Sequence, residues 1–218
     1  SGGEMFWDSG NTGSATLNKN VTTYDATIKH SGNYSAKLQS QYVALFGIGA
    51  FAAGNVFVGK FLKIDGTDGI LRFGRPFTSR PSKLVLYYRY VAGTVDYSTL
   101  SELPKNSKDM GSIYIALGDW PHQTFEGETD IPVLVKTKPA DRQLFDSNSS
   151  NVIGYGECIL KESTEGEGLI KLEIPINYRS NRKPTDIILV GSASRYGDYF
   201  TGSTGSTLWL DDLELIYE

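Results

Sequence analysis

The chain has 218 residues, a size that suits one β-domain, and 39% of them are hydrophobic, which is enough to bury a core. Its formal net charge of −4 is mild, and its basic residues are too sparse for the positive stripe of a nucleic-acid groove. The single cysteine, Cys158, excludes an internal disulfide and a cysteine-rich zinc site, and we expect it to be a small buried residue.

Strand-like runs recur along the chain, and no stretch shows three turns of helical periodicity. The expected strands are Tyr34–Val43, Val56–Ile64, Ile70–Phe73, Ser82–Val91, Ser112–Leu117, Ile131–Thr137, Val152–Lys161, Leu169–Ile176, Asp186–Ser192 and a closing strand within Gly205–Tyr217. Residues 93–111, 118–130 and 192–206 are expected to be loops. Because turn residues separate these short strands and helical crossovers are absent, the pattern predicts one all-β domain, residues 1–218, folded as an antiparallel β-sandwich.

Side-chain alternation assigns faces to the strongest of these strands. In the run Ser82–Val91, one face carries Leu84, Leu86, Tyr88 and Tyr90. In the closing strand, one face carries Leu208, Leu210 and Ile216 with Asp212 and Glu214, and the other carries Trp209, Leu213, Leu215 and Tyr217 with Asp211. Such a strand is typical of a rigid β-scaffold whose sheet it completes.

Six segments match a known family in order over nearly the whole chain: Asp8–Asn11, His30–Gln39, Ala53–Asn55, Phe73–Phe77, Ser194–Phe200 and Gly205–Tyr217. Together they resemble the putative carbohydrate metabolism domain family of Bacteroidetes surface proteins. The resemblance implies a jelly-roll β-sandwich like that of many carbohydrate-binding modules, a glycan partner and no organic cofactor. It also implies an extracellular or cell-surface setting, as the C-terminal domain of a longer secreted lipoprotein. It carries over no catalytic residues.

Two segments, Ser31–Leu38 and the terminal Leu210–Leu213, also resemble segments shared widely by jelly-roll carbohydrate-binding modules, and this resemblance implies a structural calcium ion. In many jelly-roll carbohydrate-binding modules, an early acidic residue and an Asp of the last strand hold such an ion. Asp211 and Asp212 match the late position, and the early partner is Glu4 or Asp8. Carboxylates are suitable calcium ligands. The alternative is that Asp212 caps the amides of a loop and Asp211 faces solvent.

Two loops are candidate glycan-binding segments, because sugars stack on aromatic rings and hydrogen-bond to polar side chains. The first, residues 118–130, carries Asp119, Trp120 and His122. The second, Arg195–Phe200, carries Tyr196 and Tyr199. Loops on a rigid sandwich are common places for binding sites. The alternative is that Trp120 and Phe125 only pin the first loop to the sheet.

The preferred interpretation is a non-catalytic, glycan-associated module at a bacterial cell surface. An enzymatic alternative is glycoside hydrolysis by two carboxylates, for which Glu126 and Glu128 are the candidates, although such clusters are usually solvated surface. A structural or adhesin stalk domain that binds protein is the third interpretation. With two histidines in the chain, a Ser-His-Asp triad or a histidine-rich metal centre is not expected.

Overall fold

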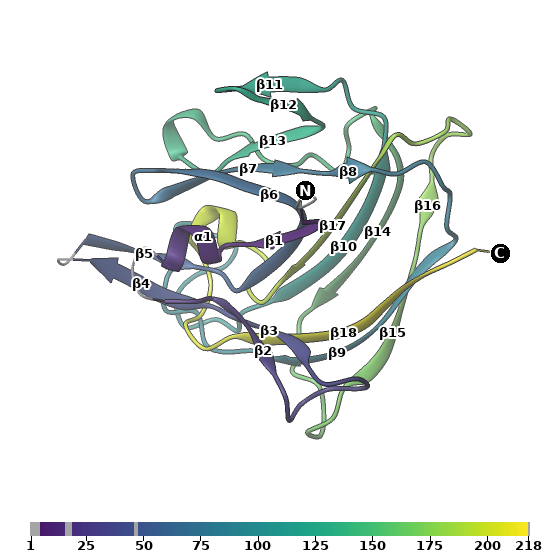
Figure 1. Cartoon of the computed structure of the whole chain (residues 1–218). Helices are drawn as coiled ribbons and strands as arrows, with labels where there is room; N and C mark the ends of the chain where they lie inside the picture. The colour runs from purple at the N-terminus through teal and green to yellow at the C-terminus, as the bar shows by residue number, and fades with distance from the viewer. Residues whose placement is uncertain (1–4, 16–18, 46–47, 218) are drawn as a thin grey trace.

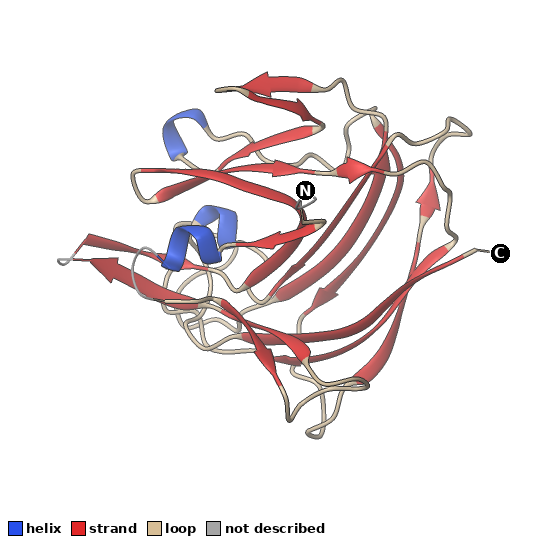
Figure 2. Ribbon diagram, in the orientation of Figure 1, coloured by secondary structure: helices blue, strands red, loops and turns tan. Residues whose placement is uncertain are grey.

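The computed structural model describes residues 5–15, 19–45 and 48–217, and its regular structure is almost entirely antiparallel β-sheet (Figures 1 and 2). Two sheets face each other across a hydrophobic core, so the predicted antiparallel β-sandwich is confirmed. Helical structure in the described residues is limited to three short turns: α1 (Asn11–Ser14), η2 (Pro139–Asp141) and η3 (Gly197–Tyr199). None of the helices that the structure describes has the length and apolar character needed to span a membrane.

The larger sheet has nine described strands, in the order β13-β7-β6-β17-β10-β14-β16, with β1 beside β6 and β8 beside β17. Their bounds are β1 Trp7–Ser9, β6 Asn55–Asp65, β7 Asp68–Phe73, β8 Arg75–Pro76, β10 Gly111–Gly118, β13 Val133–Lys136, β14 Val152–Leu160, β16 Asn177–Tyr178 and β17 Asp186–Ser192. The pairings in this sheet are antiparallel throughout the described residues.

The smaller sheet has five described strands in the order β15-β9-β18-β3-β2. Their bounds are β2 Thr22–Asp25, β3 Ser35–Gln39, β9 Lys83–Val91, β15 Ile170–Pro175 and β18 Thr207–Ile216. Two more hairpins stand beside the sheets: β4 (Gln41–Leu45) pairs with β5 (Ile48–Ala52), and β11 (Gln123–Phe125) pairs with β12 (Glu128–Ile131). The β4–β5 hairpin projects at one end of the molecule, on the left of Figure 1.

The core forms where the alternating apolar faces of the two sheets meet. From the smaller sheet, Leu84, Leu86 and Tyr90 of β9 are at most 1% exposed, which confirms the face predicted for that strand. From the larger sheet, Ile113 and Ile115 of β10 belong to the same cluster. Full burial of one such aliphatic side chain contributes about 1.5–3 kcal/mol to the free energy of unfolding.

The centre of the larger sheet is buried on its other face as well. A second cluster there contains Phe57, Ala116, Trp120 and Ile188. Segments between β10 and β14, including β13, pack over this face. Almost every residue of strands β10 and β17 is therefore buried, whereas strand β15 of the smaller sheet is mostly exposed.

Several predicted segments differ from the structure. The run Ile131–Thr137 is interrupted, because Ile131 ends β12 and Val133–Lys136 form β13. The run 34–43 is divided at Ser40, whose backbone N–H donates to the Ser206 carbonyl oxygen (3.0 Å) and whose Oγ lies 2.8 Å from Ser194 Oγ. The predicted loop 118–130 contains the β11–β12 hairpin. Its turn residues Glu126 and Gly127 have φ angles of 47° and 87°, the left-handed conformation of a tight hairpin turn. Such turns usually have Asn, Asp or Gly at the first position, so Glu126 does not indicate a hairpin in the sequence.

A β-bulge in β18 corrects the faces assigned to the closing strand. Asp212 has a φ of 48°, and the register against β9 shifts by one residue between Asp211 and Glu214. One extra residue reverses the alternation beyond it. Leu208 and Leu210 face the core as one set, but the next side chain to pack on that core is Leu215 instead of Ile216.

The bulge predicts unequal effects of two adjacent substitutions. Because Leu215 packs against the core, Leu215→Ala should lower the free energy of unfolding by about 1–2 kcal/mol. Ile216 lies on the outer face of the sheet, so Ile216→Ala should cost about 0.5 kcal/mol or less. Urea denaturation of both variants measures the difference. A larger cost at Ile216 would show that the alternation continues unbroken through Asp212.

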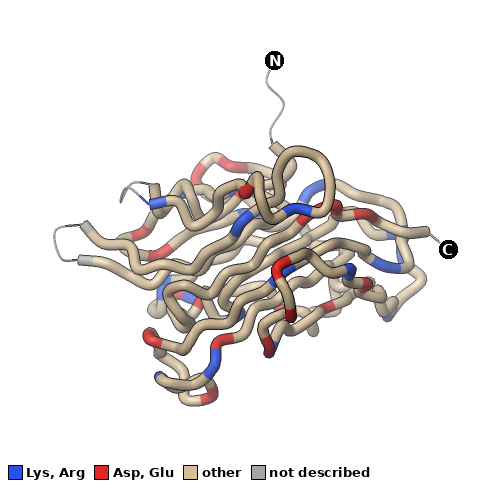
Figure 3. Tube along the Cα trace, turned by 90° about the horizontal axis from the view of Figure 1, so that it is seen from below, with Lys and Arg blue, Asp and Glu red and all other residues tan. Residues whose placement is uncertain are grey.

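Charged residues of both signs are interspersed along the backbone trace in the view of Figure 3, without a stripe of one sign. Many are paired, as Lys171 with Glu173 (2.6 Å) and Lys138 with Asp65 (3.0 Å). Solvent screens exposed pairs of this kind, so they contribute little to stability. That nucleic acid is not a partner of this chain stays a prediction.

Candidate functional site

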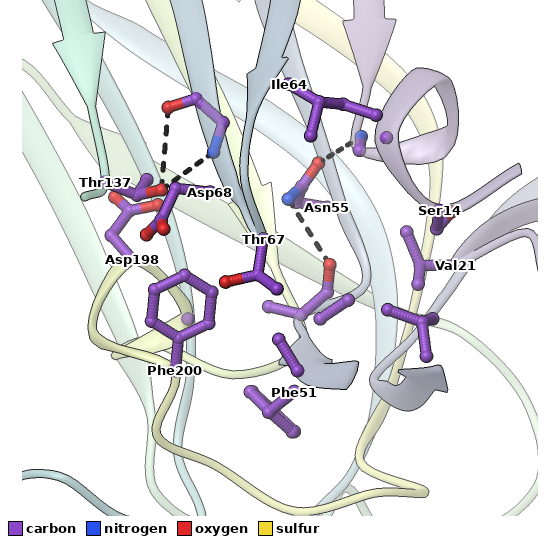
Figure 4. Close-up of a pocket in the computed structure, with 18 of the residues that line it drawn as sticks. Ser14, Val21, Phe51, Asn55, Ile64, Thr67, Asp68, Thr137, Asp198 and Phe200 are labelled. Carbon is purple, nitrogen blue, oxygen red and sulfur yellow. Dashed lines mark hydrogen bonds between the residues drawn. The ribbon is translucent and has the colours of Figure 1, made fainter. Parts of the chain in front are cut away.

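A cavity of about 470 Å³ lies between the turn joining β6 to β7, the β4–β5 hairpin, α1 and η3. Its apolar lining includes Val21, Val43, Phe51, Phe61, Leu71 and Phe200, and its polar lining consists of Ser14, Asn55, Thr67, Asp68, Thr137 and Asp198. Figure 4 shows Asp68, Thr137 and Asp198 together on one side of the cavity, with Asn55 and Ser14 on the other. This volume and this mixture of apolar surface with a few polar groups are typical of a small-ligand pocket.

Small residues make this geometry possible. Gly66 has a φ of 71°, which side chains other than glycine rarely adopt, and it allows a two-residue turn that brings Thr67 and Asp68 to the rim. Gly197 lets η3 approach the opposite wall, because a Cβ there would lie 2.3 Å from the Cβ of Ala53. The chain then turns at Phe200, which ends η3 with a φ of 52°.

Two polar side chains of the lining hold the walls together. Asn55 Oδ1 accepts the backbone N–H of Gly10 at 2.8 Å and thereby ties β6 to the segment that leads into α1. Thr137 Oγ1 accepts the backbone N–H of Gly69 at 2.9 Å and ties the segment after β13 to β7. These groups are committed to the protein, so their role in the cavity is to fix its shape.

Two other polar atoms of the lining, one on Ser14 and one on Asp68, have no hydrogen-bond partner among the described residues. Ser14 is 4% exposed, and its Oγ is buried and unpaired. The Oδ1 atom of Asp68 is also buried and unpaired. Burying a polar atom without a partner costs about 1–3 kcal/mol, so such atoms are uncommon in structures and need an explanation. A bound molecule with hydroxyl groups would supply the missing hydrogen bonds.

The two carboxyl groups of the lining are both shifted toward the protonated form. Asp198 is exposed to solvent, but it also lies among many protein atoms, and the resulting desolvation raises its pKa to about 6 against the opposing charge of Arg142. Burial also raises the pKa of Asp68, although Lys138 opposes the shift. Carboxyl groups of this kind in a cavity are characteristic of functional sites.

The raised pKa of Asp198 predicts a pH-dependent effect of Asp198→Asn on stability. The folded state binds the proton more tightly than the unfolded state, so the stability of the native chain falls as pH rises from about 4 to about 6. The Asn variant lacks this loss. Because solvent reaches the carboxylate, we expect a discounted gain of about 1 kcal/mol at pH 7.5, or roughly 2–4 °C in melting temperature. The two proteins should melt together at pH 4, and a destabilised variant at pH 7.5 would contradict the assignment.

The first predicted glycan-binding loop does not line this cavity. Trp120 is 7% exposed and packs in the second core cluster beside Phe145. His122 Nε2 lies 2.9 Å from Asp186 Oδ2, and Asp119 lies 3.6 Å from the Arg182 guanidinium. The binding role of Asp119, Trp120 and His122 stays a prediction, for a place other than this cavity.

The second predicted loop reaches the cavity through residues other than its tyrosines. Gly197, Asp198 and Phe200 belong to the lining. Tyr196 and Tyr199 contact each other edge to face, with ring centroids 6.4 Å apart, and Arg142 stacks on the Tyr199 ring. A binding role for the two tyrosines remains a prediction.

The carboxylates considered for hydrolysis stand on the β11–β12 hairpin. Glu126 pairs with Lys63 at 2.5 Å. Glu128 pairs with Lys60 (2.8 Å) and Arg72 (2.9 Å), which hold the pKa of Glu128 below its usual range. An ionised, paired carboxylate is poorly suited to act as a general acid.

The residues predicted to hold calcium are separated in the structure. Asp211 accepts the His30 backbone N–H at 2.8 Å, and Asp212 contacts His30 Nδ1 at 2.7 Å, on the smaller sheet. Asp8 lies on the larger sheet, where its Oδ2 accepts the Phe61 N–H at 2.7 Å. The alternative partner, Glu4, lies outside the described residues. Among the side chains that the structure describes, no group of three or more His, Cys, Asp or Glu is arranged to hold a metal ion.

The calcium site remains a prediction that one experiment decides. The domain is melted with and without a chelator, after loading with calcium. A midpoint that falls on chelation supports a structural ion, because a ligand that binds only the folded state stabilises it. An unchanged midpoint excludes it.

Sequence patterns alone do not single out Ser14 or Asp68 as residues of a cavity. Ser14 sits in the segment Gly10-Asn-Thr-Gly-Ser14, where the closely spaced glycines were a usable signal of close packing. Asp68 follows the turn Asp65-Gly-Thr and looks like an ordinary surface residue of a hairpin. Only the fold shows that both line one cavity.

Comparisons with known proteins point to carbohydrate metabolism. The family described as "Putative carbohydrate metabolism domain" matches residues 1–216. A solved structure titled as a putative glycoside hydrolase from Bacteroides thetaiotaomicron VPI-5482 has 22% sequence identity and a TM-score of 0.69, with 97% of this chain and 63% of that chain covered. This chain therefore spans less than two thirds of that protein.

A second solved structure, a putative glycoside hydrolase from Bacteroides vulgatus ATCC 8482, has 24% identity and a TM-score of 0.68, with 97% of this chain and 85% of that chain covered. At these identities the likeness establishes a shared fold. No curated protein matches the sequence.

Proposed function

This chain belongs to the putative carbohydrate metabolism domain family, and we propose that it binds the end of a glycan chain in the cavity between the β6–β7 turn and the β4–β5 hairpin. The observation that carries the proposal is the pair of unpartnered buried polar atoms, Ser14 Oγ and Asp68 Oδ1, in one largely apolar cavity. The domain is a non-catalytic binding module in this proposal.

The chemistry of the lining fits a sugar. A pyranose ring presents apolar C–H faces and several hydroxyl groups that donate hydrogen bonds. The C–H faces can pack against the apolar surface of Phe51, Phe61 and Phe200. The hydroxyl groups can donate hydrogen bonds to the oxygens of Ser14 and Asp68. The volume of about 470 Å³ lies within the roughly 300–1,000 Å³ of small-ligand pockets.

The shape of the site favours a chain end over the interior of a glycan. The lining comes from a hairpin turn on one side and the β4–β5 hairpin on the other, with α1 and η3 completing the wall. An internal segment needs a groove that is open at both ends. A recess closed on several sides accepts a terminal residue.

A glycan array tests the proposal with the native domain and two variants. Asp68→Ala removes the unpartnered Oδ1 with the rest of the carboxylate, and binding should be lost. Asp65→Ala is the matched control, since Asp65 stands in the same hairpin but pairs with Lys138 and does not line the cavity. Equal binding by both variants, or no glycan bound by the native domain, contradicts the proposal. Silence on the array together with unchanged folding favours the structural role.

Glycoside hydrolysis is the second candidate, and the raised pKa values of Asp198 and Asp68 favour it. A carboxyl with a pKa of about 6 is protonated in about half of the molecules at pH 6, and in that form it can act as a general acid on the glycosidic oxygen. Asp68 as a base would take a proton from the water that attacks the anomeric carbon, so the C–O bond is replaced by two hydroxyl groups. Release of reducing ends that is abolished in Asp198→Asn would establish hydrolysis. Binding without release supports the non-catalytic module.

A further inference from the structure

The charged groups around the cavity have an uneven balance. Among the described residues that line it, the only charged ones are Asp68 and Asp198. The neighbouring cations, Lys138 and Arg142, lie outside the lining. Lys138 Nζ contacts both carboxylate oxygens of Asp65, at 3.0 and 3.2 Å.

The second cation is also engaged with the protein. Arg142 Nε donates to the Thr137 carbonyl oxygen at 3.0 Å, and its guanidinium lies 4.7 Å from the centre of the Tyr199 ring. When all of these groups are ionised, there are three negative charges and two positive ones. The negative charges are on Asp65, Asp68 and Asp198, and the positive ones are on Lys138 and Arg142. A ligand in the cavity thus contacts the two carboxylates of the lining, whereas the two cations lie outside the lining.

This balance has consequences for what the cavity accepts. Hydroxyl groups donate to carboxylates, whereas a carboxylate, sulfate or phosphate on the ligand can only accept and is repelled by them. Like charges in a partly desolvated site discriminate strongly, because the solvent does not screen them fully. Among the described residues that line the cavity, none is a cation that could offset this repulsion.

We propose that the cavity selects terminal sugars that carry no negative charge and rejects uronic acids and other anionic sugars. The inference rests on the proposed function, since it names the class of glycan end that the same cavity takes. Ser14 Oγ and Asp68 Oδ1 recognise the hydroxyl groups, and the charges of Asp68 and Asp198 exclude the anionic members.

The test uses sugars of nearly equal shape and different charge. Glucose, glucuronamide and glucuronate form one series, and galactose, galacturonamide and galacturonate form the other. Each is titrated into isotopically labelled domain at pH 7, and the backbone amide signals of Thr67 and Gly69 report binding in the cavity. In the series that binds, the uronate should bind on the order of tenfold more weakly than its uronamide. Because the amide matches the carboxylate in size, the ratio of the two affinities measures the effect of the negative charge alone.

The variants and the pH dependence separate charge from shape. In Asp198→Asn and Asp68→Asn, each isosteric with the native side chain, the ratio should shrink toward about threefold. It should also shrink at pH 5, where Asp198, with a pKa of about 6, is mostly protonated and the uronate is still ionised.

Two outcomes would contradict this inference alone, and a third would also contradict the proposed function. A uronate that binds within about threefold of its uronamide at pH 7 shows that the cavity tolerates anions. A ratio that stays the same in both Asn variants shows that the two Asp residues do not cause it. If no sugar of either series perturbs the cavity, the proposed function itself fails together with this inference.

Discussion

Replacing Asp109 by alanine is expected to lower the free energy of unfolding by about 3–5 kcal/mol, the largest single effect that the structure predicts. Asp109 is 0% exposed, and one of its oxygens, Oδ2, accepts three hydrogen bonds. The donors are Ser194 Oγ (2.7 Å), the Ser203 backbone N–H (2.8 Å) and Ser206 Oγ (2.8 Å). Alanine would leave all three donors buried without this acceptor.

The effect matters for the site because the donors flank the segment that carries Asp198. Ser194 precedes η3, while Ser203 and Ser206 follow it, so Asp109 holds both ends of the cavity wall formed by Asp198 and Phe200. We expect the midpoint of guanidinium denaturation to fall in Asp109→Ala. Asp109→Asn retains one acceptor oxygen, so its denaturation midpoint should lie between those of the native chain and the alanine variant.

Asp96 provides the matched control for Asp109. It also holds this segment, by accepting the Thr204 backbone N–H at 3.0 Å, but it is exposed to solvent. Water can replace its hydrogen bonds, so Asp96→Ala should cost about 1 kcal/mol or less. Equal losses in the two variants would show that burial of Asp109 adds nothing, which contradicts the expected network.

The second large effect concerns binding. Thr67→Trp should weaken the binding of a glycan end at least about 30-fold, or about 2 kcal/mol, because the indole would occupy the cavity that Thr67 lines. Thr67 is exposed in a turn, so the substitution should change the free energy of unfolding by no more than about 0.5 kcal/mol. Titration calorimetry with a glycan identified on the array measures the loss.

Two further variants make this result interpretable. Thr129→Trp adds the same side chain at an exposed position of β12, outside the cavity, and should bind normally. Ala50→Trp fills the cavity from the opposite wall, on β5, and should lose binding as Thr67→Trp does. If all three variants bind like the native domain, the glycan is held elsewhere.

The sequence predicted the sandwich well because its strongest strands bury one face. The alternation of Leu84, Leu86 and Tyr90 is a direct consequence of the two-residue repeat of a strand against a core. The short edge strand β2 has no such pattern, since its four residues are only partly buried or exposed, and it was not predicted. The bulge at Asp212 depends on a local backbone conformation that alternation does not encode.

The cavity was harder to predict for a physical reason. Its walls are built from residues selected for small size, such as Gly13, Ala53 and Gly197, and small residues carry little chemical signal. A search for aromatic residues near polar ones directs attention to Trp120, which the second buried face of the larger sheet requires for packing. The segment Ser194–Phe200 was recognised through the family resemblance, although Asp198 was not singled out.

The most direct test of the account is a crystal structure of the domain with a glycan that it binds. We expect a terminal sugar inside the cavity, with hydroxyl groups within hydrogen-bond distance of Ser14 Oγ and Asp68 Oδ1 and without an anionic group facing Asp198. A sugar bound instead beside Trp120, or on the outer face of the smaller sheet with the cavity unchanged, would contradict it.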